Sequence, residues 1–475
     1  MDHAEFEARL GKVLALRVGR VRSLRSAERL SGGASQETYR LTVDTADGEE
    51  LMAMRRAPGG GLDVEVAPPT LATEALLMRS ARAAGVPEPE VYYVLEPEDG
   101  LGEGFVMEWL EGEALGARIV RARELDGVRP QLAYECGRVM AKIHAIDLDR
   151  AGLRERLETL TPEELLHRSW DRYKDFPTPQ PMIDFTARWL LDNMPATFDM
   201  ALVHNDFRNG NFMVDANGIV AVLDWEVAHI GDPMRDLGWI CTNSWRFGRS
   251  DRPVGGFGEY ADLFRGYEDE SGVAVDPERV KFWEVMGSFW WAVGCLGMAE
   301  HYRTGPDKTV ERPAIGRRSS ECQVDCVNLI IPGDVELVAG TDLEDCTDMP
   351  RVDELLVSVR DYLRADVMAA TSGRTNFLAR VAGNSLDIVL RELATGAEAR
   401  FREQVRLEAL LGRSGDLDAL RWELVHRLRS GEMALDDVAL TDHLRTTVVN
   451  QIAIDQPRYS GFKTALARAG IEVPE

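Results

Sequence analysis

The stretch that decides the fold runs over residues 202–225 and reads LVHNDFRNGNFMVDANGIVAVLDW. Its middle alternates apolar and other residues on both sides of an Asp-Ala-Asn-Gly turn, so we expect a β-hairpin with strands at 212–214 and 219–223. If Val214 faces Ile219 across the turn, Asn211 faces Val222. Asn211 and Asp224 are therefore expected to converge at the open end of the hairpin, with Asp206 on the loop that enters it.

These three polar side chains have the chemistry that phosphoryl transfer needs. The amide oxygen of Asn211 and the carboxylate of Asp224 would form a hard-oxygen site of the kind that Mg²⁺ prefers. The metal spreads the charge of a triphosphate while a base, here Asp206, orients a hydroxyl and accepts its proton. Asp and Asn also occur in turns because their side chains bond the local backbone, which suits Asp215 and Asn217 but does not explain the convergence of the other three.

The composition limits the partners. The chain has 475 residues with 80 acidic and 55 basic side chains, a formal charge of −25, which repels nucleic acids and anionic membranes. The longest uncharged stretch, 285–299, is too short to span a bilayer. The N-terminus lacks a signal-peptide apolar region, and the six cysteines form no regular framework. We therefore expect a cytoplasmic protein with neither a nucleic-acid nor a membrane partner.

The pattern along the chain changes twice. Residues 1–110 indicate a small sheet-rich lobe, and residues 111–335 are mostly helical around the island at 202–224. An acidic, Pro-containing segment at 336–350 is typical of a linker. Residues 351–475 form a separate helical bundle in this interpretation, with a frayed end after helices at 352–368, 375–393, 397–411 and 417–430.

The spacing His204-x-Asp206-x-x-x-x-Asn211, with Asp224 after twelve further residues, resembles the catalytic loop and metal-binding Asp of the protein-kinase-like superfamily. The words around it, Leu-Asp-Trp-Glu and Gly-Asp-Pro-Met-Arg-Asp, resemble the aminoglycoside phosphotransferase and choline kinase branch. The resemblance spans about residues 20–330. It implies an α+β, bilobal protein-kinase-like fold, with a small antiparallel-sheet N-lobe and a mostly helical C-lobe, followed here by an all-α helical bundle.

The resemblance also implies roles in the C-lobe, which would be the catalytic and acceptor-binding part. Asp206 would be the catalytic base, and Asn211 and Asp224 would bind Mg²⁺. His204 would be a structural member of the loop. Asp232 and Asp236 would brace the loop from behind, or equally cap a helix that begins near residue 233.

In the N-lobe the resemblance implies a nucleotide site. A Gly-Gly loop would cover the phosphates, Arg55 would replace the usual Lys on the α- and β-phosphates, and Glu74 would be its ion-pair partner. Arg56 competes with Arg55 for this role. The hinge between the lobes would present the purine to a short segment. The expected nucleotide-binding residues are Ser31, Gly32, Gly33, Ser35, Arg55, Glu74, Met107, Glu108 and Leu110. ATP is the default nucleotide, and GTP is the alternative.

The acceptor stays open at this stage. The family's acceptors include aminoglycosides, choline-like alcohols and hydroxyacyl thioesters, so we expect a hydroxylated small molecule. An aromatic cluster at 282–291 is typical of a core more than of an acceptor pocket, and Arg317-Arg318 of a solvated helix face. The C-terminal helices could cover the acceptor cleft, bind a protein partner or form a homo-oligomer contact. The rival hypothesis is a catalytically weak nucleotide sensor or scaffold that acts through those helices.

Overall fold

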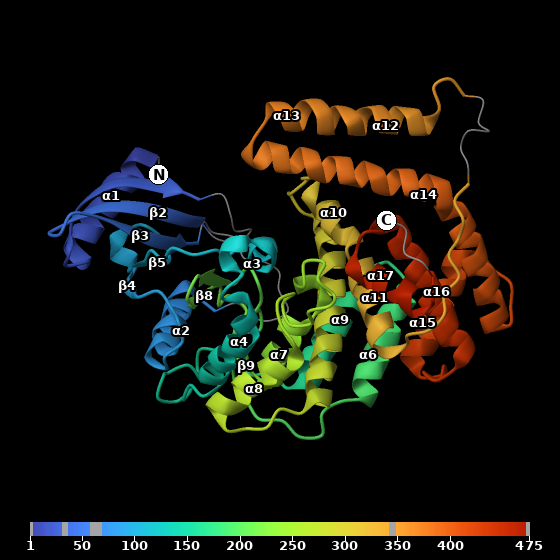
Figure 1. Cartoon of the computed structure of the whole chain (residues 1–475), viewed down its shortest axis with the longest axis horizontal. Coiled ribbons are helices and arrows are strands. Elements are labelled where there is room, and N and C mark those ends of the chain that lie inside the picture. Colours follow the sequence, from blue (N-terminus) through green and yellow to red (C-terminus); the bar gives the residue numbers. More distant parts are fainter. Residues whose placement is uncertain (1–2, 31–36, 58–68, 342–347, 472–475) are drawn as a thin grey trace.

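The computed structural model describes residues 3–30, 37–57, 69–341 and 348–471. Its N-terminal lobe is a five-stranded antiparallel sheet in the order β1-β2-β3-β5-β4, with one helix on each face (Figure 1). The two faces have separate cores, because the β5 neighbours Phe105 and Val106 point to opposite sides. The elements are α1 His3–Arg17, β1 Val21–Arg29, β2 Glu37–Thr45, β3 Glu49–Arg56, α2 Leu71–Ala83, β4 Val91–Val94, the 3₁₀ turn η1 Pro97–Asp99, and β5 Gly104–Glu108.

The C-terminal lobe surrounds the predicted hairpin with helices. Two short antiparallel strand pairs, β6–β9 and β7–β8, lie on this helical body, and the long helix α9 runs through its middle (Figure 1). Its helices and turns are α3 Gly116–Arg121, η2 Arg123–Leu125, α4 Arg129–His144, α5 Pro162–Lys174, α6 Pro181–Asp192, α7 Met234–Cys241, η3 Asn243–Trp245, α8 Tyr260–Ser271, α9 Pro277–Thr304, α10 Glu311–Arg317 and α11 Ser319–Ile330. Its strands are β6 Ala201–Val203, β7 Phe212–Asp215, β8 Gly218–Val222 and β9 His229–Gly231.

The last third is helical, as expected, but its helices differ from the prediction. The expected break near residue 395 does not exist, because α14 is one helix of 39 residues that passes through Gly396. The expected frayed end is also wrong: two further helices follow, and α16 is among the most buried of the region. The helices are α12 Val352–Tyr362, continued by a π-helical turn at Leu363–Val367 into α13 Met368–Ala370, then α14 Gly373–Leu411, α15 Leu417–Ser430, α16 Val438–Asp455 and α17 Ser460–Arg468.

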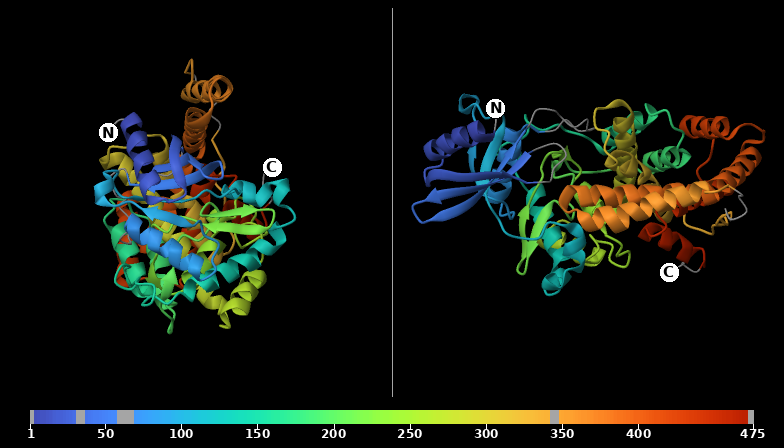
Figure 2. Two further views of the ribbon diagram at one scale, coloured as in Figure 1. Left: turned by 90° about the vertical axis from the view of Figure 1, so that its left-hand side faces the viewer. Right: turned by 90° about the horizontal axis from the view of Figure 1, so that it is seen from above.

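These C-terminal helices share a hydrophobic core with the C-lobe. Met182 and Phe185 of α6 and Val324 of α11 belong to the same buried cluster as Leu424 of α15 and Leu444 of α16. The views along other directions show α15–α17 against the body, whereas α12–α13 and the start of α14 form a hairpin that stands away from it (Figure 2). Among the described residues, no helix combines the length and apolar character that a membrane crossing needs.

Candidate active site

The loop between β6 and β7 is fixed from behind by one buried carboxylate. Asp236, at the start of α7, accepts hydrogen bonds from the backbone N–H of His204 (2.9 Å) and Asn205 (2.7 Å). His144 of α4 lies at 3.1 Å from the same carboxylate. This geometry holds Asn205 in a left-handed backbone conformation, φ 65°. The expectation that Asp236 braces the loop is thus confirmed by its contacts.

Asp232, the other acid of this motif, does both of the things that were considered. It accepts the backbone N–H of Met234 at 3.0 Å, which caps the start of α7. It also accepts from Arg279 (2.7 Å) and from the indole N–H of Trp283 (2.9 Å), both on α9. Asp232 therefore joins α7 to α9 and sets the position from which Asp236 reaches the loop.

His204 links the loop to the end of β8. Its Nδ1 lies at 3.3 Å from the backbone N–H of Asp206, and its Nε2 at 3.1 Å from the carbonyl of Leu223. A proton on Nε2 satisfies both contacts, because Nδ1 must then accept. Burial lowers the pKa of His204, which keeps the ring neutral. The contacts give His204 a structural role.

The carboxylate of Asp206 receives three side-chain hydrogen bonds. Its Oδ1 accepts from the indole N–H of Trp239 at 2.7 Å and from Nε of Arg208 at 3.0 Å. Its Oδ2 accepts from Nδ2 of Asn211 at 2.5 Å. The side chain retains 18% of its exposure, so it is oriented but still reachable. Trp239 was not a sequence candidate; the only signal for it was its place in the helix that carries Asp236.

The hairpin forms with a different register from the one expected. Val214 pairs with Ile219, as predicted, but a β-bulge in β7 moves every later pair by one residue. Asn211 therefore faces Leu223, whose N–H donates to the carbonyl of Asn211 at 2.7 Å, and the predicted facing of Asn211 and Val222 is wrong. The bulge brings Asn211 one residue nearer to Asp224 than simple counting does.

Arg55 connects the N-lobe to the end of this hairpin. Its Nη2 lies at 2.5 Å from Oδ1 of Asp224 and 3.7 Å from the carboxylate of Glu226, and its Nε at 3.2 Å from Glu74. Burial alone would lower the pKa of the Arg55 guanidinium, but Glu74 and Asp224 outweigh it and the pKa rises. The structure thus places Arg55, Glu74 and Asp224 in one charged cluster between the lobes. Asp224 itself has φ 69°, which is strained for a residue with a side chain.

Arg56, the competitor of Arg55, points to the other face of the sheet. Its Nη1 lies at 3.7 Å from Glu37, and its guanidinium lies over the ring of Phe6 in α1. Neighbouring residues of a strand face opposite sides, so only one of the two arginines can reach the hairpin. The contacts select Arg55.

The hinge residues lie at the end of β5 and just after it. Met107 pairs with Ala53 inside the sheet, and the N–H of Glu108 donates to the carbonyl of Glu90 at 2.9 Å. The N–H of Glu108 is therefore occupied, which leaves its carbonyl and the backbone of Leu110 as the groups that could meet a purine. Ser31, Gly32, Gly33 and Ser35 lie outside the described residues.

A family model now identifies the catalytic part. The model described as "Phosphotransferase enzyme family" matches residues 26–274, just over half of the chain. The chain belongs to this phosphotransferase family. A second model, "Domain of unknown function (DUF6285)", matches residues 369–459 of the phosphotransferase.

Relatives of the phosphotransferase are found among larger proteins. Mouse acyl-CoA dehydrogenase family member 10 is 27% identical over 220 residues, which is 44% of this chain and 19% of that protein. Acyl-CoA dehydrogenase family member 11 of Gallus gallus is 28% identical over 223 residues, which is 45% of this chain and 27% of that protein. The chain thus matches less than a third of the length of these relatives.

A solved structure confirms the fold of the phosphotransferase. A protein of Ralstonia eutropha JMP134 named after the aminoglycoside phosphotransferases superposes with a TM-score of 0.56 at 22% identity, over 68% of this chain and 97% of that one. The α+β fold with an antiparallel-sheet lobe, a helical lobe and further C-terminal helices is therefore as predicted.

The residues of the phosphotransferase fit a magnesium ion. Nδ2 of Asn211 donates to both Oδ2 and the backbone carbonyl of Asp206, so the amide oxygen is the end left for a cation. The described residues contain no cluster of three or more acidic, His or Cys side chains suited to a metal. Mg²⁺ does not need such a cluster, because it is commonly held by one or two protein oxygens together with phosphates and water. Asn211 and Asp224 supply a donor set of that kind.

The aromatic cluster of α9 is core, as expected, for its inward members. Phe282, Trp283 and Phe289 are fully buried. Trp290 packs edge-on against Trp239, with ring centroids 5.1 Å apart, and so supports the indole that binds Asp206. Arg317 and Arg318 are not simply solvated: they pair with Asp455 and Glu321.

Proposed function

We propose that this chain transfers the γ-phosphoryl group of ATP to a hydroxyl group of a small molecule, with Mg²⁺ as cofactor. One observation carries the proposal: Asp206 is held by three donors from different elements and contacts Asn211 directly. An acid that only decorated a turn would bond its own backbone instead. GTP is the alternative nucleotide.

The residues divide the work as follows. Asp206 orients the acceptor hydroxyl and takes its proton as the new P–O bond forms and the bond to the leaving nucleoside diphosphate breaks. Asn211 and Asp224 hold Mg²⁺, which neutralises charge on the phosphates when it is bound with the nucleotide. Arg55, fixed by Glu74, binds the phosphates from the N-lobe side.

The acceptor class is narrowed by the names of the relatives. Aminoglycoside-like, choline-like and hydroxyacyl-CoA alcohols all fit an aspartate base. Because the curated relatives are named as acyl-CoA dehydrogenase family members, we favour a hydroxyacyl thioester as the first acceptor to test. Arg208, which stacks on Trp245 at 4.2 Å beside the base, offers a cation for an anionic acceptor.

The experiment uses Asp206→Asn, with Asp215→Asn as its matched control. Asp215 lies in the turn of the same hairpin and bonds only its neighbour Asn217 among its printed contacts. ATP consumption is screened against hydroxyacyl-CoAs, amino alcohols and aminoglycosides. We expect Asp206→Asn to lower kcat on the best acceptor by about 10²–10⁴-fold while Mg-dependent nucleotide affinity stays within about threefold.

Two outcomes would contradict the proposal. Full activity of Asp206→Asn on an identified acceptor would remove the base assignment. Tight Mg-dependent nucleotide binding without turnover on the whole panel would favour the nucleotide sensor that the sequence left as the rival.

A further inference from the structure

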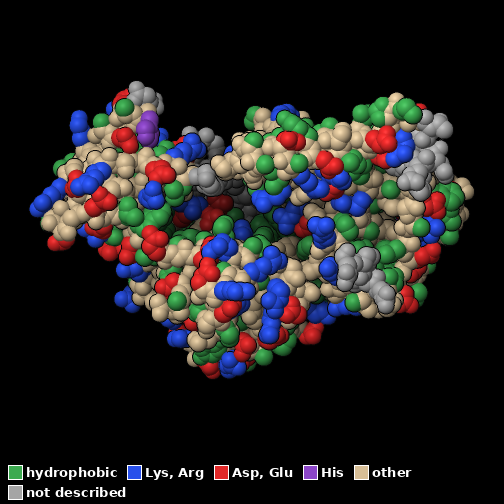
Figure 3. Space-filling view, turned by 45° about the horizontal axis from the view of Figure 1, so that its top comes forward, with side chains coloured by type: hydrophobic (Ala, Val, Ile, Leu, Met, Phe, Trp, Pro, Cys, Tyr) green, Lys and Arg blue, Asp and Glu red, His purple; other side chains and the backbone are tan. Residues whose placement is uncertain are grey.

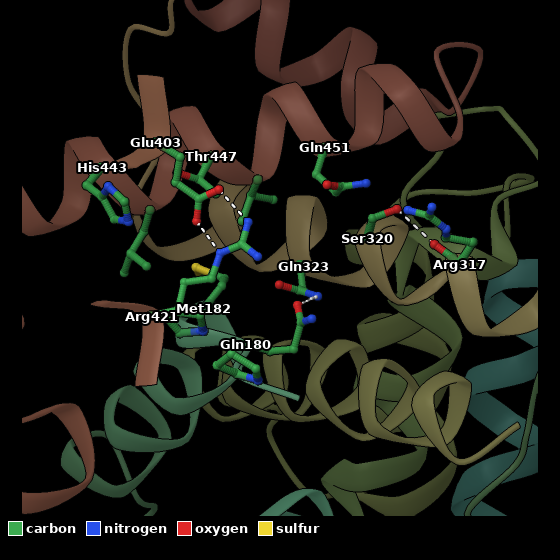
Figure 4. A pocket seen from close by; sticks show the side chains of 14 residues that line it. Gln180, Met182, Arg317, Ser320, Gln323, Glu403, Arg421, His443, Thr447 and Gln451 are labelled. Atoms are coloured by element: carbon green, nitrogen blue, oxygen red, sulfur yellow. Dashed lines mark hydrogen bonds and ion pairs between the residues drawn. The ribbon is translucent and has the colours of Figure 1, made fainter. Parts of the chain in front are cut away.

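A cavity of about 180 Å³ lies between the C-lobe and the C-terminal helices (Figure 4). The C-lobe side comes from the start of α6 and from α10–α11, and the other side from α14, α15 and α16. All of its lining residues lie outside the catalytic loop 204–211. They are Pro179, Gln180, Pro181, Met182, Arg317, Ser320, Gln323, Glu403, Arg421, His443, Leu444, Thr447, Val448 and Gln451.

One wall presents a guanidinium that is only partly used. Glu403 accepts from Nε of Arg421 at 2.7 Å and from Nη2 at 2.5 Å, which leaves Nη1 of the fork. Figure 4 shows this pair, Thr447 and Gln451 on one side of the cavity, with Gln180 and Gln323 across from it. Arg421 is therefore fixed in place with a donor in reserve.

The same wall is electropositive. His443 is 2% exposed and its Nδ1 has no hydrogen-bond partner among the described residues. Its pKa is lowered to about 3, first by burial and then by the nearby Arg406 and Arg421, so the ring is neutral. Counting Arg317, Arg406 and Arg421 against Glu403 and Asp455, the surroundings carry an excess of one positive charge in a chain whose net charge is −25.

The remaining lining is apolar. Met182, Leu444 and Val448, with two prolines, offer a hydrocarbon surface close to the charged wall. We propose that this cavity binds a small organic monocarboxylate, with the carboxylate on Nη1 of Arg421 and the hydrocarbon part against Met182, Leu444 and Val448. A guanidinium fork suits a carboxylate, and one charge balances the local excess.

The test compares hexanoate with hexanamide, which has the same shape and no charge. We expect hexanoate, and not hexanamide, to raise Tm of the full chain in a concentration-dependent way and to shift the His443 ring signals in NMR spectra of the wild-type protein. The double variant Arg421→Met/Glu403→Met removes both members of the buried pair, so no charge is left alone, and should abolish both responses.

The matched control is Arg413→Met/Glu423→Met, which removes an ion pair between the α14–α15 connection and α15 that does not line the cavity. It should respond as the wild type does. The site is disproved if carboxylates from acetate to octanoate leave the His443 signals and Tm unchanged. It is also disproved if the Arg421→Met/Glu403→Met protein folds and still responds.

A second, independent feature is the helical hairpin formed by α12, α13 and the start of α14, residues 351–393 below. It stands away from the body in Figures 1 and 2. Arg360 and Arg364 of α12 pair with Asp387 of α14 at 3.2 and 2.5 Å. α12 has no buried residue, so ion pairs hold the two helices together where an apolar core would be expected.

The apolar side chains of α12 face solvent instead. Val352, Leu355, Val359 and Tyr362 are each at least half exposed, and their spacing of three, four and three residues puts them on one helix face. Of the 16 large apolar side chains that are strongly exposed among the described residues, 10 lie between 349 and 405. A stripe of this size marks an interaction surface.

Charge selects the occupant. Residues 351–393 contain six Arg and six Asp or Glu side chains, so the hairpin is neutral within a chain of net charge −25. Two copies of the chain repel each other over most of their surface and least at this hairpin. We infer that the hairpin docks on the same hairpin of a second copy, in a twofold four-helix arrangement. The buried area would be of the order of 1,000 Å² in total, within the range of specific interfaces.

The test is the mass of the full chain by sedimentation between about 0.1 and 100 μM. We expect a reversible dimer that Leu355→Lys converts to a monomer. Asp361→Lys, on the opposite side of α12 by helical spacing, introduces the same side chain away from the stripe and should leave the dimer intact. A monomer at every concentration, or a dimer that survives Leu355→Lys, would overturn the inference.

Discussion

Trp239 shows what one residue contributes at the site. Its indole N–H donates to the same oxygen of Asp206 that Arg208 contacts, and Trp290 packs against its ring. A Trp in an apolar helix would ordinarily be assigned to the core, and by burial it belongs there. Only the fold shows that its polar edge reaches the catalytic loop, so Trp239 acts as a positioning residue for Asp206.

The change Trp239→Phe removes this donor and keeps an aromatic ring. We expect kcat to fall roughly 10- to 100-fold, the worth of a hydrogen bond to a charged group, with the nucleotide KM unchanged. The acidic limb of the kcat–pH profile should move to higher pH, because a carboxylate that loses a donor binds its proton more tightly.

Trp291→Phe is the control for this prediction, because the N–H of Trp291 is buried without a hydrogen-bond partner among the described residues. It should leave both kcat and the pH profile in place. Equal effects of the two variants would mean that ring packing, and not the N–H donor, determines the result.

At the scale of elements, α14 shows how a local signal can mislead. Thr395-Gly396 is typical of a helix end, yet the helix continues for another 15 residues beyond Gly396. A Cβ at Gly396 would meet only the ends of the Glu392 and Arg400 side chains, which can move. The helix continues because the residues beyond the glycine, including Leu407 and Leu411, are buried in the core shared with the C-lobe.

Gly396→Ala should therefore stabilise the protein. Alanine is favoured over glycine in a helix interior by up to about 1 kcal/mol, and the displaced Glu392 carboxylate is partly exposed. We expect an increase of about 0.5–1 kcal/mol in the free energy of unfolding, measured by urea titration. A loss of stability would indicate a break in α14 near this residue.

At the scale of the whole molecule, the C-terminal helices and the catalytic lobe act as one folding unit. Asp325 of α11 accepts from Tyr459, just before α17, at 2.6 Å and from Asn243 of η3 at 2.8 Å. The shared core around Met182 and Val324 surrounds the same junction. Unfolding of the C-terminal helices would expose this core.

Stability should depend on pH through Asp325. Burial first, only partly offset by hydrogen bonds from Tyr459 and Asn243, raises its pKa from 3.8 to about 7. Between these values the folded state holds a proton that the unfolded chain has released, so the free energy of unfolding falls as pH rises from about 4 to about 7. Asp325→Asn has the same shape and no charge.

The measurement is urea unfolding of both proteins between pH 5.5 and 8. The stability of Asp325→Asn relative to the wild type should rise up to about pH 7 and then stay constant, by a few kcal/mol at most. Parallel curves for the two proteins would show that Asp325 does not titrate in this window.

Removal of residues 336–475 should prevent folding of the remainder. The deletion uncovers Met182, Phe185 and Val324, which are almost fully buried in the intact chain. We expect the shortened chain to be insoluble, and the full chain to unfold with coincident transitions by far-UV circular dichroism and Trp fluorescence. A soluble fragment with native Trp fluorescence would show that the catalytic part folds alone.

The sequence by itself determined the catalytic loop, the hairpin, the order of the lobes and the choice of Asp206, Asn211 and Asp224. These are local features: spacing along the chain, turn residues and alternation fix them before distant contacts form. The same local reasoning found Arg55 and Glu74 through the strand and helix that carry them.

Tertiary structure alone decided the rest. The bulge that sets Asn211 against Leu223, the choice of Arg55 over Arg56, the indole on Asp206 and the continuity of α14 all depend on which surfaces pack together. Burial and hydrogen bonding between residues far apart in the chain outweigh local preferences of about 1 kcal/mol per residue. For that reason the sequence indicated a separate C-terminal bundle, whereas packing joined its helices to the catalytic lobe.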